Sequence, residues 1–286
     1  MKSPNYRLLD IKYLITRKIW LYLIGLIRRN LMPVFYVKWS NNFGDLLTPL
    51  ILKYYGFTPV FEYPQKAKCV VVGTILNILP SDYEGYIIGS GWTKWEHGSF
   101  SNAIIYGVRG LLTKEFLGID DHICIGDPGL LISQIYPCDI KKVYRLGIIP
   151  HESEVEDKRL KKIQDRAQGN CIIIDPRNKD CRIVLEKINS CEYIVSSSLH
   201  GLIVSDSYGI PNGRIKLNEL DGNKDFKFHD YYSSLSESLN TYQIIGYESI
   251  DQLIAITRRP DMSKINSIKR NINCMFGQFV KDLIGE

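Results

Sequence analysis

The stretch "EYIVSSSLHGLIVSDSYGIP" (residues 192–211) decides the fold of this chain, because two structural patterns meet within it. The apolar run that opens it predicts a strand, and the longer apolar run after Gly201 predicts a helix. Three serines and His200 separate the two runs. In an α/β sheet, ligands bind where a strand ends and the next helix begins. The stretch therefore predicts an α/β unit with a candidate site at its turn.

The same alternation of apolar runs and helical patterns extends in both directions along the chain. Further strands are predicted at residues 34–39, 69–73, 86–91, 103–110, 123–129, 146–150, 171–175 and 213–217. Predicted helices cover residues 46–55, 111–119, 156–168, 181–190, 201–209 and 263–284. Short continuous apolar strands that alternate with helices are typical of buried parallel sheets. The pattern restarts after residues 137–145, which divides the chain into two sets.

The sequence thus predicts an α/β protein of two Rossmann-like, doubly wound domains with a cleft between them. Residues 34–140 form the N-terminal domain, and residues 141–286 form the C-terminal domain with a capping C-terminal helix. A length of 286 residues agrees with two domains of ordinary size. A basic apolar helix is predicted over residues 1–33, before both domains.

The N-terminal segment, residues 11–29, is apolar and basic together. Its uncharged run, residues 19–27, is far shorter than the ~20 residues that span a bilayer. No small-residue cleavage site follows, so a signal peptide is not predicted. Two interpretations remain: a helix packed on the body of the protein, or a helix in an anionic membrane interface that makes peripheral membrane contact.

Charge and cysteine usage narrow the class of protein. A net charge of +5 and a pI near 8.7 favour an anionic ligand or an acidic surface but fall short of a nucleic-acid binder. The seven cysteines are odd in number, and none shares a C-x-x-C spacing. No disulfide framework, metal site or resident cofactor is therefore predicted, and the pattern favours a cytoplasmic protein.

The turn around His200 is the first candidate site. Free N–H groups at a helix start, the hydroxyls of Ser197 and Ser198 and an imidazole together suit a phosphate or carboxylate. Gly201 would let an anion approach the backbone closely. The alternative is a serine N-cap with a locally satisfied histidine. A Ser–His hydrolase is not favoured, because the G-x-S-x-G pattern is absent.

Further candidates follow other predicted strands. Arg109 directly follows one strand and could hold a carboxylate or phosphate with two parallel hydrogen bonds; the alternative is a surface ion pair. His151 ends the strand at residues 146–150 and is expected to face the same cleft. The motif "IGSG" (88–91) ends a strand with residues small enough for a ligand to touch the backbone.

Three short motifs complete the set. "NNFGD" (41–45) offers Asn42 and Asp45, although Asp45 could instead be the N-cap of the next helix. "GDPG" (126–129) predicts a tight turn in which Asp127 bonds its own backbone. "FKFHDYY" (226–232) interleaves aromatic residues with Lys227 and His229, which suits either stacking on a sugar ring or plain packing.

Taken together, these segments resemble the polysaccharide pyruvyltransferase family. The resemblance rests on an ordered set of motifs between residues 41 and 232, about two-thirds of the chain: "NNFGDLLTPLI", "VVGTILNIL", "YIIGSG", "GVRGLLT", "IGDPGLL", "IIPH", "SSSLHGLIVSDSYGIP" and "FKFHDYY". Each motif alone is weak, whereas the ordered set, above all the SS-x-LHG segment, is specific.

The resemblance implies a fold of glycosyltransferase type B and the transfer of pyruvate from phosphoenolpyruvate to a sugar diol as a ketal, with release of phosphate. The pathway would be the bacterial synthesis of extracellular or capsular polysaccharide, and the acceptor is either lipid-linked or soluble. It also implies that His200 binds the donor and acts in catalysis. Many members carry arginine just before the leucine of this motif, where this chain has Ser198.

We expect the donor phosphoenolpyruvate and the sugar acceptor to bind different sets of residues. His200 and Arg109 are the expected catalytic residues. Expected donor contacts are Ser197, Ser198, Leu199, His200, Gly201, Arg109 and Lys227. Expected acceptor contacts are Asn42, Asp45, Gly89, Ser90, Gly91, His151 and His229.

Two other functions compete with this prediction. A nucleotide-sugar glycosyltransferase would use the same architecture, because a fold alone does not determine a reaction. A non-catalytic scaffold in a polysaccharide-assembly complex would account for the serine at position 198. Binding of phosphoenolpyruvate distinguishes the predicted transferase from both.

Overall fold

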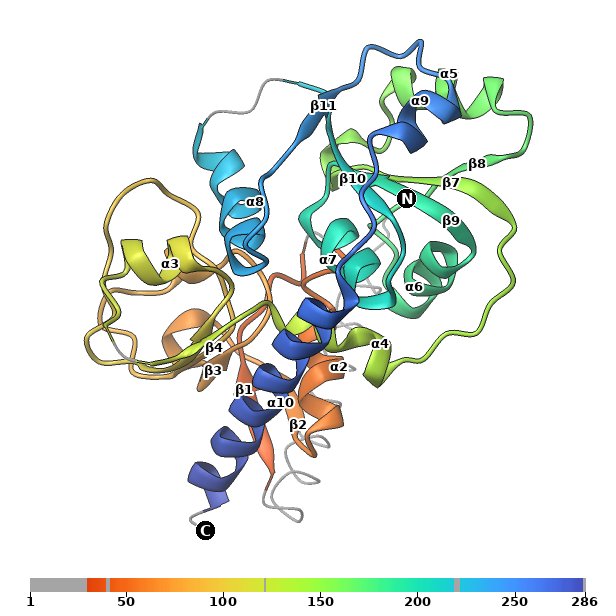
Figure 1. The fold of residues 1–286 in the computed structure, drawn as a ribbon. Coiled ribbons are helices and arrows are strands. Elements are labelled where there is room, and N and C mark those ends of the chain that lie inside the picture. Colours follow the sequence, from red (N-terminus) through yellow and green to blue (C-terminus); the bar gives the residue numbers. More distant parts are fainter. Residues whose placement is uncertain (1–29, 40–41, 121, 219–221, 285–286) are drawn as a thin grey trace, which may run out of the picture.

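Two parallel β-sheets organise the protein, whose computed structural model describes residues 30–39, 42–120, 122–218 and 222–284 (Figure 1). The described first sheet has the strand order β2-β1-β3-β4-β5-β6, and the second has the order β11-β10-β9-β7-β8. The first sheet contains β1 (Leu31–Val34), β2 (Thr58–Phe61), β3 (Cys69–Val70), β4 (Tyr86–Ile88), β5 (Ile104–Val108) and β6 (Cys124–Ile125). The second contains β7 (Tyr144–Ile149), β8 (Cys171–Ile173), β9 (Cys191–Ser196), β10 (Asn212–Lys216) and β11 (Thr241–Gln243).

Helices connect these strands, which confirms the predicted α/β class. The α-helices are α2 (Leu47–Tyr54), α3 (Leu111–Phe116), α4 (Ile132–Ile135), α5 (Lys158–Arg166), α6 (Cys181–Asn189), α7 (Leu199–Tyr208), α8 (Gly222–Ser234), α9 (Ile250–Ala255) and α10 (Met262–Ile284). Short 3₁₀ turns are η1 (Pro64–Lys66), η2 (Leu76–Ile78), η3 (Pro128–Leu131) and η4 (Glu152–Glu154). None of the described helices combines the length and apolar character that a membrane span needs.

In both sheets the order in which the chain adds strands reverses at an internal pair of strands. All pairings between neighbouring strands are parallel. In the first sheet the chain moves outward on either side of the β1/β3 pair, and in the second on either side of the β7/β9 pair. Such a switch point leaves a crevice at the carboxyl ends of its two strands, because the connecting chains leave in opposite directions. Ligand sites are therefore expected after β1, β3, β7 and β9.

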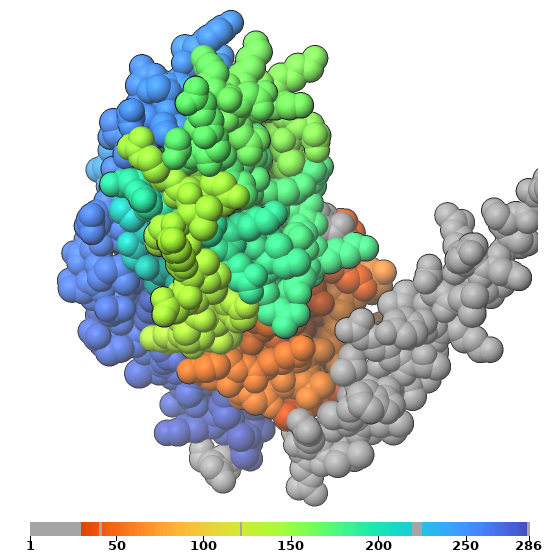
Figure 2. Space-filling model, turned by 90° about the vertical axis from the view of Figure 1, so that its right-hand side faces the viewer, coloured from red at the N-terminus to blue at the C-terminus, as the bar shows by residue number. Residues whose placement is uncertain are grey.

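One of three hydrophobic clusters among the described residues spans both sheets. It joins Val34 and Leu47 of the first half to Ile149 and Leu202 of the second, while the other two clusters lie almost wholly within one half each. The linker after α4, residues 137–143, has no regular structure and crosses the surface in yellow-green in Figure 2. It lies within the stretch where the sequence predicts the division of the chain.

The last helix, α10, returns to the first half of the molecule. In Figure 1 its dark blue ribbon extends down across the first half of the molecule, and it contacts β5, β6 and η3. Phe276 stacks on Tyr55 with ring centroids 4.2 Å apart. Residues 141–286, predicted as one domain, therefore include a helix that covers the other sheet.

Some boundaries differ from the prediction. The first strand is β1 and not residues 34–39, because the chain leaves the sheet after Val34. The segment "FKFHDYY" lies in α8, for which no helix is predicted above. The N-terminal helix predicted over residues 1–33 lies outside the described residues up to residue 29, and residues 31–33 belong to β1.

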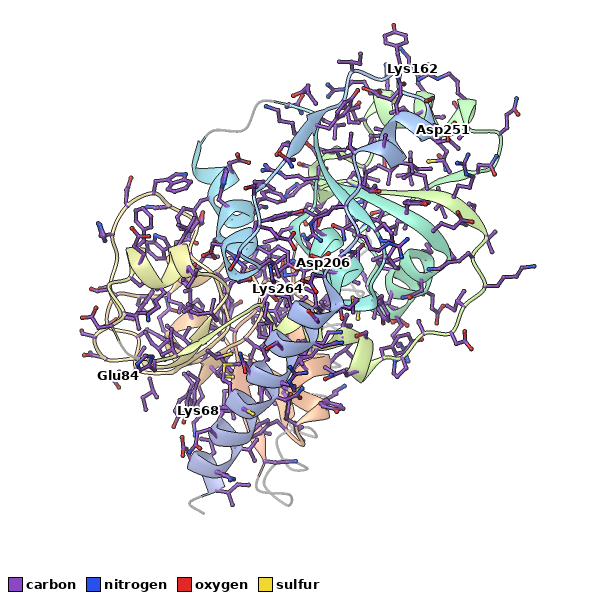
Figure 3. The ribbon with its side chains drawn as sticks, viewed as in Figure 1. Lys68, Glu84, Lys162, Asp206, Asp251 and Lys264 are labelled. Carbon is purple, nitrogen blue, oxygen red and sulfur yellow. The ribbon has the colours of Figure 1, made fainter. Side chains whose placement is uncertain are left out.

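A buried carboxylate fixes α7, the helix that follows β9. Asp206 lies at the centre of the molecule, between α7 and the first turns of α10 (Figure 3). It accepts hydrogen bonds from the Tyr231 hydroxyl at 2.6 Å, Arg258 Nη2 at 2.8 Å and Asn212 Nδ2 at 2.6 Å. These bonds tie the last turn of α7 to β10, to α8 and to the chain before α10.

Candidate functional site

A cavity of about 330 Å³ lies where the two switch points meet. Its lining comes from the segments after β1, β3, β7 and β9, together with one lysine of α8. The lining residues are Val37, Trp39, Asn42 and Asp45 after β1, Thr74 and Ile75 after β3, His151 and Glu152 after β7, Ser198, Leu199 and His200 after β9, and Lys227. The strand order of the two sheets therefore predicts a ligand site at the position of this cavity.

Half of the expected site residues line this cavity. From the expected donor set they are Ser198, Leu199, His200 and Lys227, and from the expected acceptor set Asn42, Asp45 and His151. These residues are spread over 186 positions of sequence, from 42 to 227, and meet because four parallel strands end at one place.

His200 is an almost fully enclosed polar group of the cavity. It is 6% exposed, and its Nε2 has no hydrogen-bond partner among the described residues. The ring packs against the backbone of Gly44, where an added Cβ would stand only 2.0 Å from His200 Nδ1. Burial, reinforced by the positive charges of Arg109 and Lys227, lowers the pKa of His200 to about 3. The imidazole is therefore neutral at pH 7 in the substrate-free protein.

The pKa of Asp45 shifts in the opposite direction, upward. Burial and the neighbouring Glu152 carboxylate raise the pKa of Asp45 to about 8, although Lys227 opposes the shift. Its Oδ1 lies against Gly73, where φ is +116° and an added Cβ would be 2.7 Å away. Asp45 is also not the N-cap of α2, because Leu46 holds that position without a side-chain cap. The cavity thus contains a protonated carboxyl group at neutral pH.

Lys227, a residue of α8, adds a positively charged side chain to the cavity lining. Burial, with the charge of Arg109, lowers the pKa of its ammonium group to about 8, while Asp45 opposes this shift. Its Nζ lies 5.3 Å from the centroid of the Phe228 ring. The amine and the Asp45 carboxyl group interact, so they titrate as a coupled pair.

The sequence-based set lacks five lining residues, Val37, Trp39, Thr74, Ile75 and Glu152. Glu152 and Trp39 are the two that offer a carboxylate and an exposed aromatic ring. Glu152 begins the 3₁₀ turn after β7, and its Oε2 is buried with no hydrogen-bond partner among the described residues. Trp39 is 60% exposed at the edge of the cavity and is an aromatic surface open to a ligand. Both follow strand ends, as do the residues that the sequence analysis does select.

Arg109 differs from both interpretations of the sequence, since it neither lines the cavity nor lies on the surface. Its guanidinium is fully buried and pairs with Asp230 at 2.8 Å. It also donates to Thr74 Oγ1 at 2.6 Å and to the Trp92 carbonyl at 2.9 Å. Arg109 therefore acts on the cavity through its charge and through Thr74, and not by gripping a ligand.

The "IGSG" motif makes room for the protein's own groups, and its members do not line the cavity. Gly89 has φ of +100° and packs on the Pro128 ring, and an added Cβ at Gly91 would be 2.1 Å from the Arg109 guanidinium carbon. Ser90 is fully buried. Gly201 likewise faces the Ser196 hydroxyl, 2.2 Å from an added Cβ, where an anion was expected.

Two more expected contacts lie elsewhere. Ser197 Oγ donates to Glu154 Oε2 at 2.5 Å and accepts from the His151 N–H at 2.9 Å, in a neighbouring cavity. His229 is exposed on α8, 3.4 Å from Asp225. The aromatic residues of "FKFHDYY" are buried, so of the two interpretations packing is confirmed. The Asp127 turn is also confirmed, because its Oδ1 accepts from the Gly129 N–H at 2.8 Å.

The fold and the cavity define an α/β protein of two parallel sheets with a polar cavity at their strand ends. Among the described residues, no group of three or more His, Cys, Asp or Glu side chains is placed to hold a metal ion. The comparison with known proteins then gives the family. The model of the polysaccharide pyruvyl transferase family matches residues 3–215, and the chain belongs to this family.

Two relatives have similar sequences. The succinoglycan biosynthesis protein ExoV of Rhizobium meliloti is 29% identical over 211 residues, which cover 71% of this chain and 64% of that protein. The uncharacterized protein L143 of Acanthamoeba polyphaga mimivirus is 34% identical over 198 residues, 58% of this chain and 66% of its own length. The matches thus span slightly less than two-thirds of either relative. No solved structure matches the chain.

Proposed function

We propose that this protein transfers pyruvate from phosphoenolpyruvate to a sugar diol during polysaccharide biosynthesis, forming a ketal and releasing phosphate. The observation that carries this proposal is the cavity at which the switch points of both sheets meet in a member of this family. Phosphoenolpyruvate is a co-substrate, so the scheme needs no resident cofactor. We include in the proposal a two-domain arrangement of the glycosyltransferase B type.

The cavity offers hydrogen-bond donors and one cationic side chain to an anionic donor substrate. Phosphoenolpyruvate carries a carboxylate and a phosphate, and the N–H groups that begin α7 point a positive dipole end at the cavity. Ser198 holds the N-cap position without a side-chain cap bond, so its hydroxyl is available to the donor. Lys227 supplies the formal positive charge of the lining.

We assign the proton transfers to Asp45 and His200, the two side chains whose pKa values are shifted. One sugar hydroxyl attacks C2 of the enol, neutral His200 accepts its proton, and Asp45 donates a proton to C3. The imidazolium formed at His200 then neutralises the phosphate and passes its proton to it as the C2–O bond to phosphate breaks. The second hydroxyl closes the ketal ring, and its proton restores Asp45. Two hydroxyl protons are lost, one to C3 and one to phosphate, so the step balances.

Trp39 provides an acceptor platform in this scheme. Its ring is the exposed aromatic surface of the cavity lining, and the aromatic residues of α8 are occupied in packing. An aromatic face beside polar groups is the usual composition of a site for a small polar ligand. We propose that the sugar ring lies on Trp39 with its diol toward His200. A lipid-linked acceptor and membrane contact through residues 11–29 belong to the same proposal.

The test is phosphate release from phosphoenolpyruvate in the presence of a panel of aryl and lipid-linked glycosides. We expect release that depends on an acceptor and a product that is heavier by the pyruvate ketal. His200→Gln should lower the rate by about 10²- to 10⁴-fold. Release of the nucleotide from a nucleotide sugar, with no phosphate released from phosphoenolpyruvate, would favour a glycosyltransferase. Absence of phosphoenolpyruvate binding would favour a scaffold.

A further inference from the structure

A second cavity, of about 360 Å³, adjoins the first and shares His151 and Lys227 with it. It lies at the carboxyl ends of β9 and β10, and Arg214, Ser197 and Asn218 also line it. The proposed function uses none of these three residues. Because the two cavities meet at Lys227, one ligand or two neighbouring ligands can occupy both.

Arg214 is the unusual member of this lining. Its side chain comes from β10 and is 2% exposed, and its guanidinium lies 3.8 Å from the centroid of the Phe228 ring. Nη2 makes an ion pair with Asp225. The other two nitrogens, Nε and Nη1, are buried without a hydrogen-bond partner among the described residues.

Unpaired guanidinium nitrogens inside a protein are costly, because a buried charged donor has lost its water and gained no partner. The Phe228 ring and the ion pair with Asp225 fix the plane of the group, so the N–H groups on Nε and Nη1 have defined directions. These two nitrogens lie on either side of Cδ and do not form a fork. Each can donate a single charge-assisted hydrogen bond to an anion.

We propose that the Arg214 cavity binds a phosphoryl group, held by Arg214 and Lys227. The two cationic groups come from β10 and α8, and two converging cations suit an anion with several acceptor oxygens. Glu154 also lines the cavity, but its Oε2 already accepts the bond from Ser197. This inference rests on the proposed function only for the origin of the phosphate, which is either the donor or a phosphorylated sugar acceptor.

The test measures the binding of inorganic phosphate to the full chain by calorimetry, without turnover. We expect Arg214→Met to weaken phosphate binding at least tenfold. A second variant, Asn218→Asp, adds a negative charge at an exposed lining position and can retain the bond from Arg159 at 3.2 Å. It should weaken binding in the same direction, and it decides the test if Arg214→Met fails to fold. Arg182→Met, at an exposed ion pair with Asp180, is the matched control and should bind as the wild type does.

Competition separates the two sources of phosphate. Displacement of phosphate by phosphoenolpyruvate alone assigns the cavity to the donor, and displacement by a sugar 1-phosphate alone assigns it to the acceptor. Unchanged phosphate binding in both Arg214→Met and Asn218→Asp would overturn the inference. Phosphate binding that depends on Arg214, without turnover of phosphoenolpyruvate, would instead refute the proposed function and leave this site standing.

Discussion

The protonation of two cavity side chains is set by their surroundings and not by their residue type. Asp45 has a folded pKa of about 8, above the 3.8 of an unperturbed aspartate, whereas His200 has a folded pKa of about 3, below its usual 6.5. Burial is the first cause of both shifts, since it disfavours the charged form of an acid and of a base alike. A protonated carboxyl group and a neutral imidazole thereby coexist at neutral pH.

Asp45→Asn should stabilise the protein as pH rises. Between about pH 4 and pH 8 the folded protein holds a proton on Asp45 that the unfolded chain has released, so stability falls with rising pH in this window. The asparagine variant lacks this loss. Urea unfolding at pH 5 and pH 8 should show a gain over wild type that grows by on the order of 1 kcal/mol or more. An equal difference at both pH values would mean that Asp45 titrates normally.

His200 contributes a pH dependence of opposite sign. Its folded pKa is depressed, so its contribution to stability is present above about pH 6.5 and is lost as pH falls toward 3. The effect is common to the wild type and Asp45→Asn. Comparing these two proteins therefore separates the coupled pair of Asp45 and Lys227 from His200.

Gly44→Ala should remove activity with little effect on the fold. The new Cβ would stand 2.0 Å from His200 Nδ1, so the imidazole must move out of the cavity. A displaced catalytic base costs about 10²-fold or more in rate. The matched control is Gly277→Ala in α10, where nothing lies within 4 Å of an added Cβ and the helix gains roughly 0.5–1 kcal/mol. Wild-type phosphate release by Gly44→Ala would exclude His200 from the reaction.

Elements with a strong local pattern are predictable from the sequence, and those determined by tertiary contacts are not. The strand and helix around His200 follow from an apolar run, a serine turn and a second apolar run. Strand β2 is an edge strand containing Pro59, and its sequence has little of the apolar continuity that marks a buried strand. Helix α8 has a weak helical periodicity because its aromatic residues pack into two different hydrophobic clusters.

In the candidate site, too, some residues are predictable from the local sequence and others depend on tertiary contacts. Strand ends indicate His200, Asp45 and His151, because a parallel sheet gathers them at one edge. The sequence does not show that Arg109 has a partner 121 positions later, in Asp230. Glycines that pack against Arg109 or Ser196 have the same local appearance as glycines that contact a ligand. Only the three-dimensional contacts distinguish these cases.

The buried pair of Arg109 and Asp230 should hold α3 against α8. Asp230 accepts from Arg109 Nε at 2.8 Å and also from the Thr113 N–H and hydroxyl, both at 2.7 Å. Arg109→Met or Asp230→Asn alone should cost about 3–5 kcal/mol, because each leaves an unpaired buried group. In the double variant the loss should be clearly smaller than the sum. Additive losses in urea unfolding would show that the two groups do not depend on each other.

The two sheets are joined more closely than two separately folding domains would require. Their switch points face one cavity, one hydrophobic cluster spans both sheets, and α10 returns from the second half to cover the first. A site assembled from both halves keeps its geometry only if the halves stay together. Shared burial therefore positions the cavity as well as stabilising the fold.

Phe276→Ala should consequently destabilise both halves in one transition. The ring is fully buried, stacks on Tyr55 and belongs to the cluster that spans both sheets, so its removal should cost about 3–5 kcal/mol. All four tryptophans precede residue 100, so their fluorescence follows the first half, and amide hydrogen exchange of β7 and β9 follows the second. Ile183→Ala, at an exposed position of α6, is the control and should change stability by no more than about 0.5 kcal/mol. Loss of protection confined to the first half would show that the sheets unfold independently, and the cavity would then depend on their docking alone.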